Sequence, residues 1–73
     1  MVQDSNKIVT ERKYDNPSGE DPLTVQIIRT PAFHYNARIL DGDKCLALTV
    51  FRDTWDEANA DAMSEVKRIF DAA

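Results

Sequence analysis

The C-terminal half of the chain constrains the fold most, because its pattern is that of a β-hairpin followed by a capped helix. Two segments of alternating apolar and polar residues, 33–40 and 45–52, flank the sequence Asp41-Gly42-Asp43-Lys44. Asp-Gly between two such segments is a common signal for a tight hairpin turn. A helical pattern follows over residues 53–72. The stretch therefore predicts a hairpin whose apolar face packs under one helix.

Residues 53–72 have the features of an amphipathic helix. Thr54 and Glu57 have the spacing of a capping box, and Asp53 and Asp56 suit the positive end of a helix dipole. At 3.6 residues per turn the apolar side chains share one stripe, which we expect to cover the sheet. Its members are Trp55, Ala58, Ala62, Met63, Val66, Ile69, Phe70 and Ala73.

The rest of the chain completes a small α+β domain. Residues 1–6 read as a polar tail, 7–14 as a possible edge strand and 15–22 as a loop rich in turn residues. Residues 23–52 read as a three-stranded meander that begins with a strand at 23–29. The prediction for residues 1–73 is one domain, an antiparallel β-meander of three to four strands followed by one C-terminal amphipathic helix packed on one face (β-β-β-β-α).

The register of the meander follows from keeping the large apolar side chains on one face. A hairpin loop with an even number of residues pairs Tyr35 with Val50, Ala37 with Leu48 and Ile39 with Leu46. A three-residue loop over 30–32 pairs Ile27 with Tyr35 and Val25 with Ala37. Both pairings predict one apolar and one polar face.

Composition limits the cellular setting. Cys45 is the only cysteine, so the chain cannot form an intramolecular disulfide, which favours a reducing cytoplasm for a domain of 73 residues. No apolar run approaches the roughly 18 residues that a membrane-spanning helix needs. The N-terminus lacks the charged and apolar segments of a signal peptide. We expect a cytoplasmic protein with no membrane partner.

The sequence offers no set of residues suited to catalysis or metal binding. The predicted register places Cys45 and His34 about 20 Å apart, too far for a nucleophile and its base. Asp41-Gly42-Asp43 resembles the start of a calcium loop, but Cys45 and Leu46 stand where a third ligand and a glycine are needed. We therefore expect no enzyme activity, no catalytic or metal-binding residue and no cofactor.

The predicted helix carries a row of acidic residues. Residues 53–73 hold six acidic and two basic side chains, and Asp53, Glu57, Asp61 and Glu65 are spaced four apart. Like charges at this spacing repel by a few tenths of a kcal/mol, and the helix start accounts only for Asp53 and Glu57. The spacing, about 6 Å, is similar to that of phosphates along a nucleic-acid strand. The row predicts contact with a basic protein surface, or else a solvated face that aids solubility.

The outer face of the predicted sheet is the second candidate surface. The side chains expected there are of the types that contact bases and phosphates: Gln26, His34, Asn36, Arg38 and Thr49, with Thr24 beside them. This set predicts a DNA-binding face. The alternative is the ordinary solvated face of an antiparallel sheet.

Two resemblances to known families accompany these patterns. The run Asn36–Met63 (NARILDGDKCLALTVFRDTWDEANADAM) is similar in layout to the arm-type DNA-binding domain of phage integrases. That resemblance implies DNA contact through Gln26, His34, Asn36, Arg38 and Thr49, although those domains are usually basic and this chain has a net charge of −4. The segment 54–60 (TWDEANA) resembles the start of a helix in HicB-type antitoxins, without the glycine expected before it.

In size, acidity and β-plus-α layout the chain also looks like the small inhibitors made by phages, including anti-CRISPR proteins. Our leading hypothesis is a non-enzymatic, protein-binding inhibitor or regulator from a phage or mobile element. It would act on nucleic-acid-handling machinery through nucleic-acid mimicry by the acidic helix face. The first alternative is a DNA-binding module that uses the sheet, and the second is a structural or assembly subunit.

Overall fold

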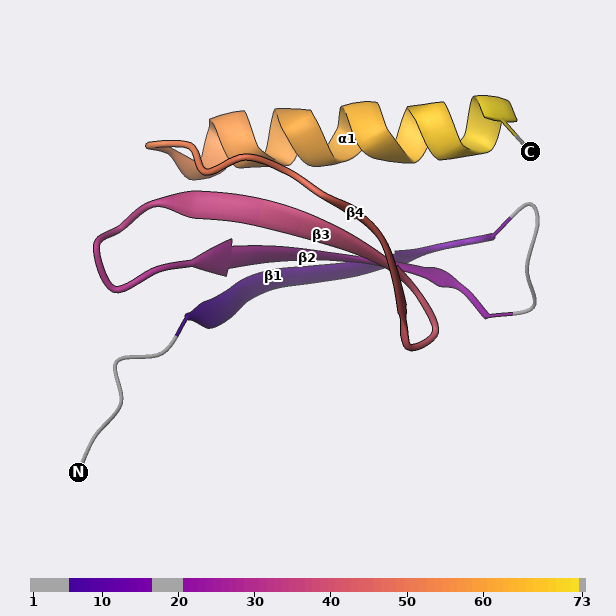
Figure 1. The fold of residues 1–73 in the computed structure, drawn as a ribbon, viewed down its shortest axis with the longest axis horizontal. Helices are drawn as coiled ribbons and strands as arrows, with labels where there is room; N and C mark the ends of the chain where they lie inside the picture. Colours follow the sequence, from indigo (N-terminus) through magenta and orange to yellow (C-terminus); the bar gives the residue numbers. More distant parts are fainter. Residues whose placement is uncertain (1–5, 17–20, 73) are drawn as a thin grey trace.

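The computed structural model describes residues 6–16 and 21–72. Within them, four antiparallel strands form one sheet in the order β1-β2-β3-β4, and one helix lies over a face of that sheet (Figure 1). The elements are β1 (Lys7–Tyr14), β2 (Leu23–Arg29), β3 (Tyr35–Asp41), β4 (Lys44–Leu48) and α1 (Trp55–Ala72). The predicted α+β class and element order are confirmed. The predicted tail up to residue 5, the loop residues 17–20 and Ala73 lie outside the described residues.

The core lies between α1 and the two central strands. Alternate residues of β2 and β3 point toward the helix, as the period of two in their apolar pattern requires. The fully buried side chains are those of Leu23, Val25, Ile27, Ala37, Ile39, Ala58 and Ala62. Val66 joins them, and Trp55 and Ile69 pack at the margin. The described part of the predicted helix stripe therefore faces the sheet. Met63 and Phe70 lie at its exposed edge, where the Met63 sulfur still accepts a hydrogen bond from the Tyr14 hydroxyl of β1 (3.4 Å).

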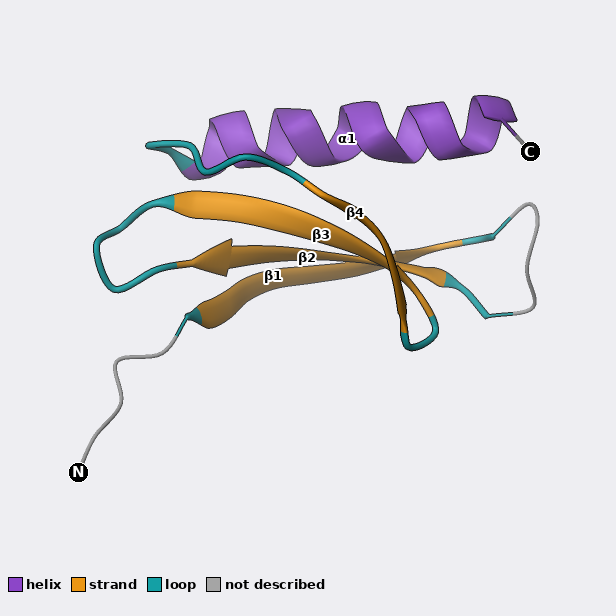
Figure 2. Cartoon of the chain, in the orientation of Figure 1, coloured by secondary structure: helices purple, strands orange, loops and turns teal. Residues whose placement is uncertain are grey.

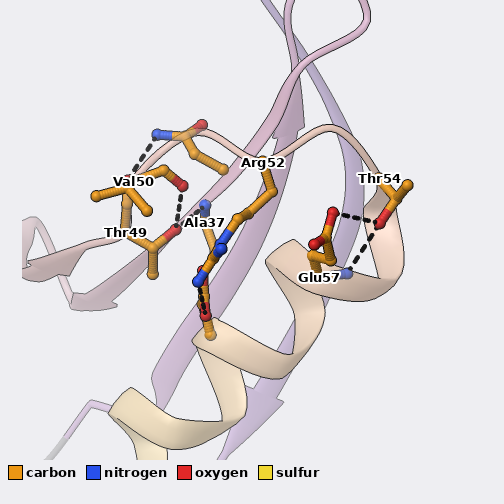
Figure 3. Close-up of polar contacts among 8 residues, drawn as sticks. Ala37, Thr49, Val50, Arg52, Thr54 and Glu57 are labelled. Carbon is orange, nitrogen blue, oxygen red and sulfur yellow. Dashed lines mark hydrogen bonds and ion pairs between the residues drawn. The ribbon is translucent and has the colours of Figure 1, made fainter.

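The start of the helix is fixed by the predicted cap. The Thr54 hydroxyl oxygen accepts a hydrogen bond from the backbone N–H of Glu57 (3.2 Å), and the same hydroxyl bonds the Glu57 carboxylate (3.1 Å), as Figure 3 shows. The indole N–H of Trp55 donates to the Thr10 hydroxyl of β1 (2.9 Å). Asp53 and Thr54 therefore precede the helix, which begins at Trp55.

The predicted register between β2 and β3 is wrong by two residues. Ile27 pairs with Ala37 rather than Tyr35, and Val25 pairs with Ile39. The reason is the turn, which covers residues 30–34 instead of 30–32, so β3 begins at Tyr35. Because the shift is an even number of residues, the apolar side chains stay on the predicted face.

Phe33 occupies the position in this turn that most strains the backbone. Its φ of 62° lies in the left-handed region, which costs a residue with a Cβ roughly 1–2 kcal/mol. The Phe33 N–H donates to the Thr30 carbonyl (2.9 Å), and the Thr30 N–H donates to the His34 carbonyl (2.8 Å). These bonds hold the turn closed. The predicted place of Phe33 inside a strand is therefore wrong.

The predicted pairing between β3 and β4 is also wrong. Asp41 pairs with Lys44 around a two-residue turn, in which Gly42 adopts the positive φ (60°) that such turns favour. A β-bulge at Leu46 then moves the register, so that Ile39 pairs with Ala47. Beyond the bulge, Leu48 pairs with Arg38 on the outer face instead of packing in the core.

Candidate protein-binding surface

β4 ends at Leu48 because the side chain of Thr49 competes for the sheet's hydrogen bonds. The Thr49 N–H donates to the Ala37 carbonyl (2.9 Å), but the Ala37 N–H donates to the Thr49 hydroxyl (2.8 Å) instead of a backbone carbonyl (Figure 3). The chain returns to the sheet only at Arg52, which exchanges two backbone bonds with Tyr35 (2.6 and 2.7 Å). The intervening residues are drawn in Figure 2 as part of the loop that runs from the end of β4 to the start of α1.

This local break opens a shallow groove between the end of β4 and α1. We name it the β4–α1 groove, and it has a volume of about 260 Å³. Its lining residues are Leu48, Thr49, Val50, Arg52, Asp61, Ser64 and Glu65. Leu48 and Val50 are each 66% exposed, which is unusual for large aliphatic side chains that lie close together. The lining of the groove thus combines exposed aliphatic residues from the end of β4 with acidic residues of α1.

One ion pair spans the groove between the loop that precedes α1 and the helix itself. The Arg52 guanidinium binds the Asp61 carboxylate with two hydrogen bonds, Nε to Oδ2 at 2.7 Å and a terminal nitrogen to Oδ1 at 3.2 Å. These hydrogen bonds, together with the positive charge of Arg52, lower the pKa of the Asp61 carboxyl below its usual value. Figure 3 shows the Arg52 side chain reaching down to the helix.

The remaining residues of the acidic row each have a local contact. Arg68, one turn further along α1, binds the Glu65 carboxylate (Nε to Oε1, 3.0 Å). Glu57 is engaged in the helix cap. On the surface, Asp53 Oδ1 lies 3.8 Å from His34 Nε2. The structure therefore brings Asp61 and Glu65 into the groove and leaves Asp53 and Glu57 at the helix start.

The Arg52–Asp61 pair has a pH-dependent consequence. Because the pKa of folded Asp61 is lowered, its contribution to stability is present above the unfolded carboxyl's pKa, near 3.9, and is lost as the pH falls through the folded value. Arg52→Gln should therefore lower stability at neutral pH, and its difference from wild type should shrink below about pH 4. Urea unfolding of both proteins at several pH values across this range measures the difference in their free energies of unfolding. In an Asp61→Asn background the effect of Arg52→Gln should not vary with pH.

The predicted DNA-contacting residues are largely engaged with one another. Gln26 is 8% exposed, and its amide donates to Glu11 (2.8 Å) while accepting from Arg38 Nε (2.6 Å). Asn36 is 5% exposed and donates to the Thr49 carbonyl (3.5 Å). The expectation of a solvated polar face at these positions is wrong, because flanking side chains on neighbouring strands cover the central ones.

His34 and Thr49 do not join that set. His34 lies in the turn before β3 and Thr49 follows β4, where its hydroxyl is bonded to Ala37. Thr24 is also buried, with Lys13 Nζ 3.4 Å from its hydroxyl. Gln26, Asn36 and Thr49 therefore offer few free donors and acceptors for reading base edges, whereas the His34 side chain is exposed.

The described parts of the chain hold few other chemical groups of interest. They contain no cluster of three or more His, Cys, Asp or Glu side chains suited to a metal ion. Cys45 is an exposed free thiol on β4. No helix within 6–16 and 21–72 is both long and apolar enough to cross a bilayer.

Sequence reasoning missed four residues of the groove. Leu48 and Val50 were assigned to the core, and Arg52 and Ser64 were not singled out. Thr49, a residue whose hydroxyl can replace a backbone partner, was the available signal that β4 would end there. Nothing in the local spacing indicates that Arg52 reaches Asp61, because the two belong to different elements.

Comparisons with known proteins give no further assignment. No protein family matches the chain, and the searches of curated proteins and of solved structures found no match.

Proposed function

We propose that this protein acts by contact, as a non-enzymatic regulator or inhibitor that holds a protein partner with a basic surface. The observation that carries the proposal is the β4–α1 groove, whose lining combines the exposed aliphatic residues Leu48 and Val50 with the acidic residues Asp61 and Glu65. Exposed apolar patches rimmed by polar residues mark interaction sites, and protein interfaces combine a desolvated centre with a polar rim. A partner that places aliphatic side chains between lysines or arginines fits this surface.

The charges favour a mixed apolar and ionic contact over pure phosphate mimicry. Arg52 and Arg68 each neutralise part of the acidic row, so Asp61 and Glu65 do not present two free charges. Charge at an interface contributes more to specificity and association rate than to affinity. Apolar contact with Leu48 and Val50 therefore supplies the affinity, and the carboxylates select a basic partner.

A narrower form of the proposal concerns the identity of the partner. The four-residue spacing of Asp53, Glu57, Asp61 and Glu65 supports a partner in nucleic-acid-handling machinery, with the carboxylates standing where phosphates would bind. This narrower proposal includes a phage or mobile-element origin and a cytoplasmic location. The single cysteine and the small acidic layout support it.

Affinity capture from the lysate of the producing cells, with and without nuclease, tests the proposal. We expect a captured protein that resists nuclease and is lost with Glu65→Lys, because a like charge then faces the partner. Asp71→Lys is the matched control, since it makes the same change in charge on an exposed helix residue outside the groove. Circular dichroism should show that both variants are folded.

Two outcomes contradict this function. Capture that Glu65→Lys leaves unchanged, or reduces no more than Asp71→Lys does, removes the groove from the interface. Capture that disappears with nuclease shows instead that the protein is held through nucleic acid, as the DNA-binding alternative requires.

A further inference from the structure

The turn between β2 and β3 holds a strained and exposed aromatic side chain. Phe33 combines a φ of 62° with a side chain that is 62% exposed. Folding alone disfavours this choice, because glycine or asparagine fits the left-handed backbone better and an exposed phenyl ring adds little to the core. Strain of this kind that persists in a fold points to a use beyond stability.

The surrounding turn restrains the backbone that carries Phe33. Three hydrogen bonds close the turn: Phe33 N–H to the Thr30 carbonyl, Thr30 N–H to the His34 carbonyl, and His34 N–H to the Thr30 hydroxyl (3.1 Å). Pro31 fixes one more backbone angle inside it. A side chain displayed on so restrained a backbone loses little conformational entropy when it is buried by a partner.

A cation accompanies the ring. The Arg29 guanidinium lies over the Phe33 ring, 5.1 Å from its centroid. No carboxylate among the described residues forms an ion pair with Arg29. Aromatic residues, phenylalanine among them, and arginine are enriched at protein interfaces relative to the rest of the surface. Phe33 therefore presents an exposed apolar side chain, and beside it lies the positive charge of Arg29, which no described carboxylate pairs.

We infer that the β2–β3 turn is a second anchor for the protein partner, with Phe33 entering an apolar pocket and Arg29 meeting a carboxylate at its rim. This inference rests on the proposed function, since it assigns the turn to the same protein partner. The turn lies at the same end of the molecule as the helix start (Figure 1). The backbone bonds between Tyr35 and Arg52 and the approach of His34 to Asp53 connect the two regions. One partner can thus span the acidic row and the turn.

Opposite effects on stability and binding test the inference. Phe33→Asn should raise the melting temperature by about 4 °C, since asparagine tolerates the left-handed backbone, and should weaken partner capture at least about tenfold. Phe33→Ala keeps the strain and removes the ring, so it should weaken capture equally with little change in melting temperature. A fall in melting temperature for Phe33→Asn would make the ring structural and overturn the inference.

A photo-crosslinking experiment decides the case without purifying a partner. With p-benzoylphenylalanine in place of Phe33, irradiation of the full chain in lysate should give one adduct, which Arg29→Gln weakens. The same probe in place of Phe70, on the exposed side of α1, is the control and should give none. No adduct at the first position overturns the inference, and so does an adduct of twice the chain's mass, which would identify a second copy as the occupant.

The two proposals fail in distinguishable ways. If Glu65→Lys abolishes capture while Phe33→Asn and Phe33→Ala bind like wild type, the groove stands and the turn is not an anchor. If Glu65→Lys has no effect while both Phe33 variants lose the partner, the turn binds and the groove does not.

Discussion

Ile39→Ala is expected to lower the free energy of unfolding by about 3 kcal/mol. Ile39 is fully buried on β3 beneath α1, and it is among the largest of the fully buried side chains. Removing three carbons there loses their transfer free energy and leaves a cavity that the sheet cannot close. A domain of this size has only about 5–10 kcal/mol of stability, so a measurable unfolded fraction should appear on mild warming.

Urea unfolding followed by Trp55 fluorescence and by circular dichroism measures this loss. Ile8→Ala is the matched control, because it makes the same chemical change on β1, where the side chain is half exposed. We expect the control to cost less than about 1 kcal/mol. Equal losses for the two variants would mean that α1 does not pack on β3 as described.

The parts of the fold that could be predicted are those set by local periodicity. The alternation in residues 23–29 and the helical stripe of 53–72 each identified the buried face of an element. The Thr54–Glu57 cap located the helix start to within two residues. Such signals are carried by neighbours in the chain, so no tertiary information is needed to interpret them.

The errors in strand register arose where hydrogen bonds between distant parts of the chain determine which of several local conformations forms. The turn after β2 could close over three residues or five, and the spacing of apolar residues on one face is the same for both. The bulge at Leu46 and the hydroxyl of Thr49 each replaced a regular pair of β4 with an irregular one. Each is a small local change, but together they moved Leu48 and Val50 from the predicted core to the surface.

The candidate site shows the same division. The acidic row could be predicted from its four-residue spacing, since residues that far apart share a helix face. That Arg52 would pair with Asp61 depended on the path of the loop before α1, which the sequence pattern does not specify. Leu48 and Val50 are exposed only because the bulge at Leu46 and the early end of β4 take them out of the predicted register. A site built from irregular segments is therefore the part of such a chain that patterns predict least well.

Ala62→Leu is expected to cost about 2–3 kcal/mol, because the helix approaches the sheet closely at a residue that has only a methyl group. Ala58 and Ala62 have no exposed surface, and both face the central strands. A leucine at position 62 would have to enter filled space or push α1 outward. Ala60→Leu makes the same change on the exposed side of the same helix and should cost less than about 0.5 kcal/mol.

The displacement should also reach the groove, because Asp61 and Glu65 lie on either side of position 62 along the helix. Moving α1 away from β4 lengthens the reach from Arg52 to Asp61 and widens the groove. At a temperature where Ala62→Leu is still folded, partner capture should therefore weaken, whereas Ala60→Leu should capture like wild type. Full capture by a folded Ala62→Leu variant would show that the interface does not depend on how closely α1 and β4 approach each other, and would leave the turn at Phe33 as the main anchor.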